Sequence, residues 1–212
     1  MAIKPILFNT EMVRAILDGR KTCTRRIIKA EKVDNVLNSP ARKSNPDIPD
    51  AQFIKCLVDM KYEPGDILYV RETWGEGYEE GTYIYRADDK LADLQTFKEA
   101  SKIIYHPSIH MPKEAARIWL KVTDVRVERL KDMTNNDALK EGAEGVKCNH
   151  AGLGVFGCTD CMNTGSLEPP LLEFIGIWNS TVKKSDLDRY GWDASPWVWV
   201  IEFERCEKPE SL

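Results

Sequence analysis

The sequence predicts an α+β fold in which a small open β-barrel carries flanking helices and surface insertions. Several short apolar segments with strand-like character are interleaved with a few helical ones, and breaker residues separate them. Strands interleaved with few helices are typical of a small barrel with helices at its ends. The 212 residues are enough for one well-buried domain and do not require two. We therefore expect residues 1–212 to form a single domain with insertions at about 30–62 and 145–168.

The order of the elements follows from apolar periodicity and from breakers. After a first strand, a helix is expected to end at Gly19, which can adopt the left-handed conformation. Residues 30–62 are rich in Asn, Asp, Pro and Lys, which indicates an insertion with at most a short helix. Apolar positions change parity between Val122 and Val125, which predicts a β-bulge. The predicted strands are 3–8, 23–28, 67–73, 82–87, 117–130 and 197–204, and the predicted helices are 9–19, 91–104, 134–142 and 170–181.

Charge and hydropathy limit the class of protein. The formal net charge of -4 excludes a generally basic nucleic-acid-binding protein, so any RNA contact must come from a local patch. The sequence lacks a stretch of 18 apolar residues, and its first residues lack the apolar core of a signal peptide. We expect a cytoplasmic protein without a membrane partner. Its six cysteines should then be thiols or metal ligands.

The segment from Gly19 to Arg26 packs four cations and two hydroxyls into eight residues. Such a cluster suits an anionic ligand, and the alternative is a solvated basic strand. A free lysine amine can also activate a threonine hydroxyl, so this segment is a candidate for catalysis.

Gly19-Arg20-Lys21-Thr22 followed by Thr24 resembles the signature of the ASCH domain family, whose fold is similar to the PUA RNA-binding module. Residues 64–74, 137–142 and 196–203 resemble further blocks of that family, in family order. Residues 107–112 resemble the longer ASCH proteins encoded by prophages. The resemblance implies a PUA-like barrel and a function related to RNA or nucleosides.

The compact ASCH amidohydrolases remove the acetyl group from N4-acetylcytidine with a Lys, a Thr three residues later and a Glu. Lys21 and Thr24 match that motif, and Glu141 matches the third position. The implied mechanism is acyl transfer in which Lys21 accepts the proton of Thr24 and Glu141 orients the lysine or protonates the leaving amine. On a regular strand Lys21 and Thr24 would face opposite sides, so they can share a pocket only through a turn or a bulge. The alternative for Glu141 is a solvated side chain at a helix end.

Six further residues are candidates for substrate binding, namely Arg20, Arg26, Arg71, Glu72, Trp74 and His110. The donors to a developing oxyanion are expected to be Arg20, Arg26 or backbone N–H groups at the turn. Trp74 flanks a glycine-rich connection where a base can stack. The alternatives are an internal ion pair of Glu72 with Arg20 or Arg26 and a merely structural or surface role for His110.

A second cluster combines three thiols and one imidazole within fourteen residues: Cys148, His150, Cys158 and Cys161. This spacing, with a Cys-x-x-Cys turn and nearby glycines, suits a tetrahedral structural zinc site. The alternative is an exposed glycine-rich loop with incidental cysteines. We expect zinc as the only cofactor and no organic cofactor.

Three functions remain open at this stage. The first is a hydrolase of an acylated nucleobase amide, with a modified nucleoside as substrate. The second is a non-catalytic module that binds single-stranded RNA through the basic segment and aromatic rings. The third is an ASCH-type ribonuclease that uses Lys21 as general acid or base.

Overall fold

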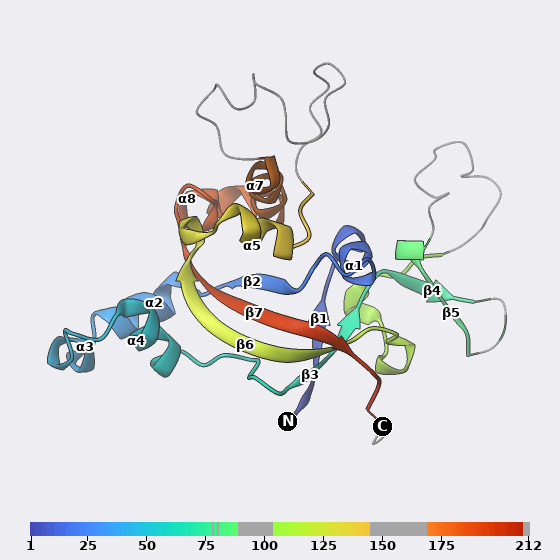
Figure 1. The fold of residues 1–212 in the computed structure, drawn as a ribbon, viewed down its shortest axis with the longest axis horizontal. Coiled ribbons are helices and arrows are strands. Elements are labelled where there is room, and N and C mark those ends of the chain that lie inside the picture. Colours follow the sequence, from blue (N-terminus) through green and yellow to red (C-terminus); the bar gives the residue numbers. More distant parts are fainter. Residues whose placement is uncertain (78, 80, 89–103, 145–168, 210–212) are drawn as a thin grey trace, which may run out of the picture. The chain divides into compact units, whose positions relative to one another are not determined.

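The computed structural model describes residues 1–212 except 78, 80, 89–103, 145–168 and 210–212 (Figure 1). The chain divides into two compact units. Unit 1 comprises residues 1–19, 62–123 and 203–212, and unit 2 comprises residues 20–61 and 124–202. Strands and helices are both present in each unit, which confirms the α+β class. Within the described residues, the structure has no helix of the length and apolarity that crossing a membrane requires.

Five strands form the main sheet, in the order β1-β3-β6-β7-β2. Their bounds are β1 Ile3–Leu7, β2 Cys23–Ile27, β3 Ile67–Arg71, β6 Trp119–Arg129 and β7 Trp197–Cys206. The β1–β3 pair is parallel, whereas β3–β6 and β2–β7 are antiparallel. Among the described strands β1 and β2 are the two edges of this order, which suits Pro5 because proline cannot donate a ladder hydrogen bond.

Unit 1 contains β1, β3 and helix α1 (Thr10–Leu17). It also contains a separate two-stranded sheet of β4 (Trp74–Glu76) and β5 (Tyr83–Tyr85). Three-residue 3₁₀ helices η1, η3 and η4 cover Arg86–Asp88, Ser108–His110 and Lys113–Ala115. Trp74, Met111 and Trp119 are buried in one apolar cluster that Tyr83 and Tyr85 flank. Gly19 has φ +75°, so the helix ends at the predicted left-handed glycine.

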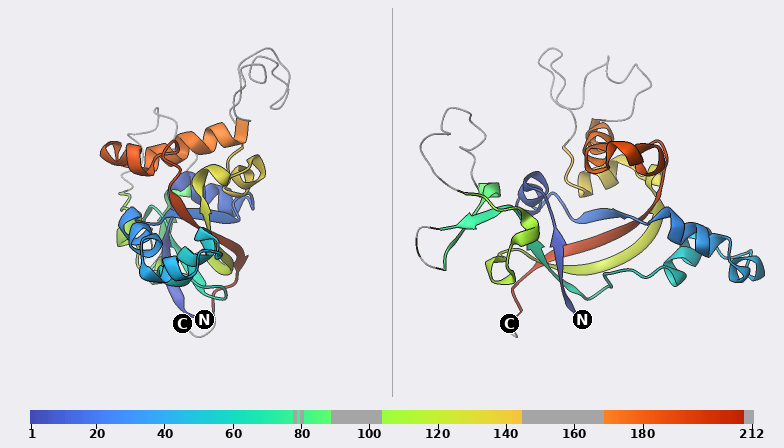
Figure 2. Two further views of the ribbon diagram at one scale, coloured as in Figure 1. Left: turned by 90° about the vertical axis from the view of Figure 1, so that its left-hand side faces the viewer. Right: turned by 180° about the vertical axis from the view of Figure 1, so that it is seen from behind.

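Unit 2 contains β2 and the helices α5 (Asn135–Lys140), α7 (Pro169–Thr181) and α8 (Leu187–Tyr190), with 3₁₀ turns η5 (Leu130–Asp132) and η6 (Lys184–Asp186). One core cluster of this unit gathers apolar side chains from α5, α7, the start of β7 and the segments next to them: Leu130, Met133, Ala138, Ala143, Leu171, Phe174, Trp178, Trp192, Val198 and Val200. Figure 2 shows α5 and α7 side by side from two further directions. The side of β7 that carries Val198 and Val200 therefore faces these helices.

The change of parity predicted in the long strand is present. Leu120 and Val122 are buried on one phase of β6, and Val125 and Val127 are buried on the other. The exposed Thr123 and half-buried Asp124 lie between the two phases. The buried face of the strand thus changes between Val122 and Val125.

The prediction of at most one short helix in residues 30–62 was wrong, because this region holds three helices. They are α2 (Ala30–Leu37), α3 (Pro40–Ser44) and α4 (Asp50–Leu57). Helices α2 and α4 pack together and bury Val33, Phe53 and Ile54, so tertiary contacts stabilise helices whose sequences are mostly polar. The Ser39 side chain caps α3 by accepting from the Arg42 N–H, with Pro40 at its first position. The predicted helix 91–104 lies almost entirely outside the described residues.

Candidate functional site

The turn that carries Lys21 is attached to the end of helix α5. The Thr22 N–H donates to the Lys140 carbonyl at 2.8 Å, and the Arg20 guanidinium donates to the Gly142 carbonyl at 2.7 Å. Strand β2 begins only at Cys23. Lys21 therefore belongs to the turn, as one of the two predicted routes to a shared pocket requires.

Helix α5 ends so that Glu141 points inward. Thr134 and Asp137 form a capping box at its first turn, and Glu141 is its C-cap residue. Gly142 then adopts φ +96°, and the Ala143 N–H donates to the Ala138 carbonyl at 3.1 Å. Glu141 is only 8% exposed, so the alternative of a solvated side chain at a helix end is wrong.

Lys21, Glu141 and Arg25 form a buried cluster of charges, called here the charge cluster. Lys21 Nζ lies 2.5 Å from Glu141 Oε2 and also donates to the Glu141 carbonyl at 2.8 Å. Arg25 donates to the other carboxylate oxygen, Oε1, at 3.2 Å. The side chains of Lys21, Arg25 and Glu141 are 0%, 1% and 5% exposed. Removing three charges from water is costly unless they compensate one another, so each depends on the other two.

A ladder of alternating charges continues from this cluster. Arg25 also pairs with Glu128 at 3.4 Å, and Arg126 pairs with both Glu128 and Glu202. Burial opposes the charged form of Arg126, but hydrogen bonds to these two carboxylates hold the pKa of Arg126 above its usual range. The ladder is neutral overall because cations and carboxylates alternate, so it does not form an excess of positive potential.

Cys23 lies against this cluster, within reach of the Arg25 guanidinium at 3.8 Å. Burial, helped by the Glu141 carboxylate, raises the pKa of the Cys23 thiol to about 12 against the opposing effect of Arg25 and Lys21. The thiol therefore stays protonated at neutral pH, which makes Cys23 a packing residue rather than a nucleophile.

Thr24 is buried, but the register of β2 assigns it to the other side of the sheet. Arg25 pairs with Val200 and Thr24 pairs with Ile201. Because Val200 faces α5 and α7, Arg25 faces them too, and alternation turns Thr24 and Arg26 to the opposite face. The structure thus brings Lys21 and Glu141 together as predicted, while Thr24 shares the face of Arg26.

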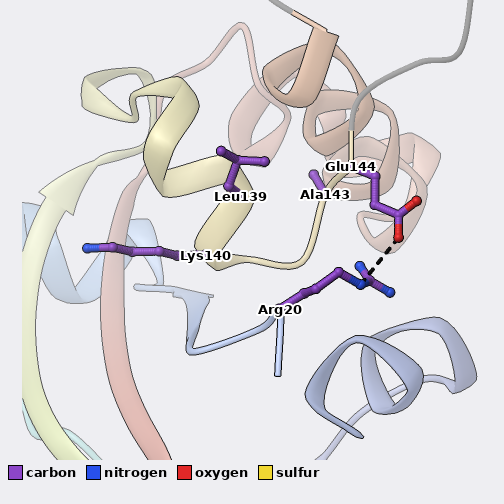
Figure 3. A pocket seen from close by; sticks show the side chains of 5 residues that line it. All are labelled: Arg20, Leu139, Lys140, Ala143 and Glu144. Carbon is purple, nitrogen blue, oxygen red and sulfur yellow. Dashed lines mark ion pairs between the residues drawn. The ribbon is translucent and has the colours of Figure 1, made fainter. Parts of the chain in front are cut away.

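A pocket of about 420 Å³ adjoins the charge cluster (Figure 3). Its walls are the side chains that neighbour Lys21 and Glu141 along the chain: Arg20, Leu139, Lys140, Ala143 and Glu144. Arg20 and Glu144 point toward one another at 3.2 Å, and Lys140 points away from that pair.

Glu72 and Arg71 belong to unit 1, where each has its own partner. Glu72 is 1% exposed, and Arg117 binds its two oxygens at 2.9 and 3.1 Å. The predicted partners Arg20 and Arg26 were therefore wrong, although the internal ion pair itself is present. Burial raises the pKa of Glu72 despite the opposing effect of Arg117. Arg71 donates to the Ile109 carbonyl.

Trp74 and His110 also lie in unit 1. Trp74 is 8% exposed and packs edge-on against Tyr83 at 5.7 Å and against His106 at 5.2 Å, so it is a core residue there. Its buried Nε1–H has no hydrogen-bond partner among the described residues. His110 is exposed at the end of η3.

The predicted zinc ligands Cys148, His150, Cys158 and Cys161 lie outside the described residues. Elsewhere, in the part of the chain that the structure describes, His, Cys, Asp and Glu side chains do not form a group of three that could hold a metal ion. Cys23, Cys56 and Cys206 are free thiols.

The sequence did not identify Arg25 as the second ion-pair partner of Glu141, nor Arg117 as the partner of Glu72. The ladder residues Arg126 and Glu128 were detectable, because two opposite charges two apart on a strand share one face. The position of Arg25 depends on the pairing of β2 with β7, which places Arg25 opposite Val200, 175 residues further along the chain.

Comparisons with known proteins give little further guidance. No family model matches the chain, and no curated protein matches it. A solved structure described as that of the hypothetical protein PH0355 aligns with 97% of this chain and 100% of its own, at 14% identity and a TM-score of 0.38. A likeness of that size supports no conclusion about fold or activity.

Proposed function

We propose that this protein is an ASCH-type hydrolase of an acylated nucleobase amide of the N4-acetylcytidine class, built on a PUA-like open barrel. The observation that carries the proposal is the buried Lys21–Glu141 pair at 2.5 Å, beside a pocket of about 420 Å³. That volume is within the range of roughly 300–1,000 Å³ that is usual for small-molecule sites. The sequence motifs that resemble the ASCH family contain both residues of the pair.

Amide hydrolysis needs a proton removed from the attacking oxygen and another delivered to the leaving nitrogen. In the proposed mechanism, the shared proton moves to Glu141 and the freed Lys21 amine takes the proton of the attacking hydroxyl. Glu141 then protonates the nucleobase nitrogen as the C–N bond breaks, and water releases acetate. Arg25 holds Glu141 Oε1, so Oε2 remains directed at Lys21.

The resemblance to the ASCH amidohydrolases suggests Thr24 as the nucleophile. The pairing of β2 with β7 turns Thr24 to the face opposite Arg25, which favours water as the nucleophile instead. The variants Thr24→Val and Thr24→Ser separate the two. If the hydroxyl attacks, Thr24→Val should lose turnover by about 10²–10⁴-fold and Thr24→Ser should keep it. Steady-state deacetylation rates decide, with far-UV circular dichroism as the check on folding. Turnover by Thr24→Val near that of the wild type would assign the attack to water and leave the Lys21–Glu141 relay in place.

The non-catalytic RNA-binding alternative is less well supported by the geometry. Lys21 and Arg25 are buried, and Arg20 pairs with Glu144, so three of the four cations in the basic segment have carboxylate partners. Phosphates bind exposed lysines and arginines. Incubation with single-stranded RNA tests this alternative and the ribonuclease together. Binding without cleavage would support the binding module, and cleavage would support the ribonuclease.

For residues 145–168 we propose a structural zinc held by Cys148, His150, Cys158 and Cys161. Protein purified without chelator should contain about one equivalent of zinc by elemental analysis, because three thiolates and an imidazole complete a tetrahedral site. Cys158→Ser should lower that content sharply. The exposed Cys56 is the matched control, and Cys56→Ser should leave the zinc content unchanged. Less than about half an equivalent in the wild type would leave these residues an ordinary insertion.

A further inference from the structure

A second pocket, of about 170 Å³, lies in unit 2 between α2, α8 and the start of β7. Its apolar walls include Val33, Leu37 and Pro196, and its polar walls include Arg129 and Arg189. None of these residues belongs to the charge cluster. The pocket is smaller than the roughly 300 Å³ at which sites for drug-sized molecules begin, so it suits a small ligand.

Hydrogen bonds hold the walls of this pocket in place. The Ala30 N–H donates to the Tyr190 hydroxyl at 3.2 Å and joins α2 to α8, and the Trp178 indole donates to the Tyr190 carbonyl at 2.9 Å. Arg129 donates to the Ser195 carbonyl at 3.1 Å, where Ser195 has a positive φ of 45°. A non-glycine residue in that conformation is costly and requires its surroundings to fix it.

Two guanidinium groups lie against aromatic rings of this pocket. The Arg129 guanidinium stacks over the Trp197 ring at 4.3 Å, and the Arg189 guanidinium lies 5.5 Å from the Tyr190 ring. Arg129 has no ion pair among the described residues, and Arg189 has only an exposed one, with Glu31 at 3.2 Å. Both arginines therefore retain N–H groups for a ligand, since a guanidinium carries five.

The charges and walls together select the class of ligand. Two arginines and one acidic residue, Asp34, line the pocket, so its lining is net positive. Guanidinium groups favour phosphate oxygens because they can donate two parallel hydrogen bonds. The apolar and aromatic walls favour a ring on the same molecule. We infer that this pocket binds a small aromatic phosphate, with its phosphate on Arg129 and Arg189 and its ring against Val33 and Leu37.

The test titrates phenyl phosphate into the full chain and follows the indole N–H resonance of Trp197, identified by its loss in Trp197→Phe. We expect saturable binding, with inorganic phosphate at least about tenfold weaker because it lacks the ring. Phenol, which lacks the charge, should not bind. Arg129→Gln and Arg189→Gln should each weaken the binding of phenyl phosphate by about tenfold or more.

Arg42→Gln is the matched control for Arg189→Gln, because Arg42 also combines an ion pair, with Asp50 at 2.9 Å, and a ring contact, with Phe53 at 5.5 Å, but does not line the pocket. It should bind phenyl phosphate like the wild type. Equal binding of phenol and phenyl phosphate would overturn the inference. So would unchanged affinity in both pocket variants, or the absence of saturation below about 10 mM, where binding is no longer specific. None of these outcomes depends on whether the protein is a hydrolase.

Discussion

Glu141→Leu is expected to lower the free energy of unfolding by about 3–5 kcal/mol, because it leaves the buried Lys21 without its carboxylate. Lys21 would then be a buried cation whose side chain is 0% exposed, and Glu128 would be the carboxylate left to Arg25 among the described residues. Urea unfolding, followed by circular dichroism, measures the change through the midpoint and slope. The effect should be among the largest of any single substitution in the chain.

The double variant Lys21→Met/Glu141→Leu should be more stable than Glu141→Leu alone, since it removes the unpaired cation. Glu144→Leu is the matched single control. Glu144 also pairs with an arginine, Arg20, at 3.2 Å, but its side chain is 55% exposed, so its loss should cost less than about 1 kcal/mol. A cost for Glu141→Leu as small as that for Glu144→Leu would show that the charge cluster does not hold unit 2 together.

Lys21→Met is expected to lower kcat on N4-acetylcytidine by about 10²–10⁴-fold, because the relay loses the group that accepts the proton of the attacking oxygen. Methionine keeps the length of the buried stem, and Arg25 still compensates Glu141. Circular dichroism and thermal unfolding should therefore report a folded protein at the assay temperature. The measurement is the initial rate of cytidine release at saturating substrate.

Lys131→Met is the control for this experiment. The Lys131 side chain is 45% exposed and pairs with the exposed Asp193 at 3.6 Å, so its loss should leave the rate unchanged. A folded Lys21→Met protein with the rate of the wild type would remove Lys21 from the mechanism.

Local signals in the sequence located most elements near their observed bounds. Gly19 ended α1, the Thr134 cap began α5, and the parity change in β6 fell between Val122 and Val125. Each of these signals acts within a few residues of the feature that it predicts. Helices α2 and α4 were missed because their stability depends on packing against one another, which a window of sequence does not contain.

In the candidate site, too, the sequence predicted what motifs carry and missed what depends on contacts between distant segments. Lys21 and Glu141 were paired through sequence motifs, and the structure brings their side chains into contact. Arg25 was counted only as one cation of a basic segment, because its partners Glu128 and Glu141 are more than 100 residues away. The face of Thr24 likewise depends on the register of β2 with β7, and no local pattern sets that register.

The most direct measurement of the central claim is the release of cytidine and acetate when the wild-type protein is incubated with N4-acetylcytidine. The proposed mechanism predicts equal amounts of the two products, formed over many turnovers at a rate proportional to enzyme concentration. Thermal unfolding of the same sample would verify that the protein is folded. Failure of the folded wild-type protein to release either product above the rate in buffer would contradict the claim that the Lys21–Glu141 pair hydrolyses this class of amide.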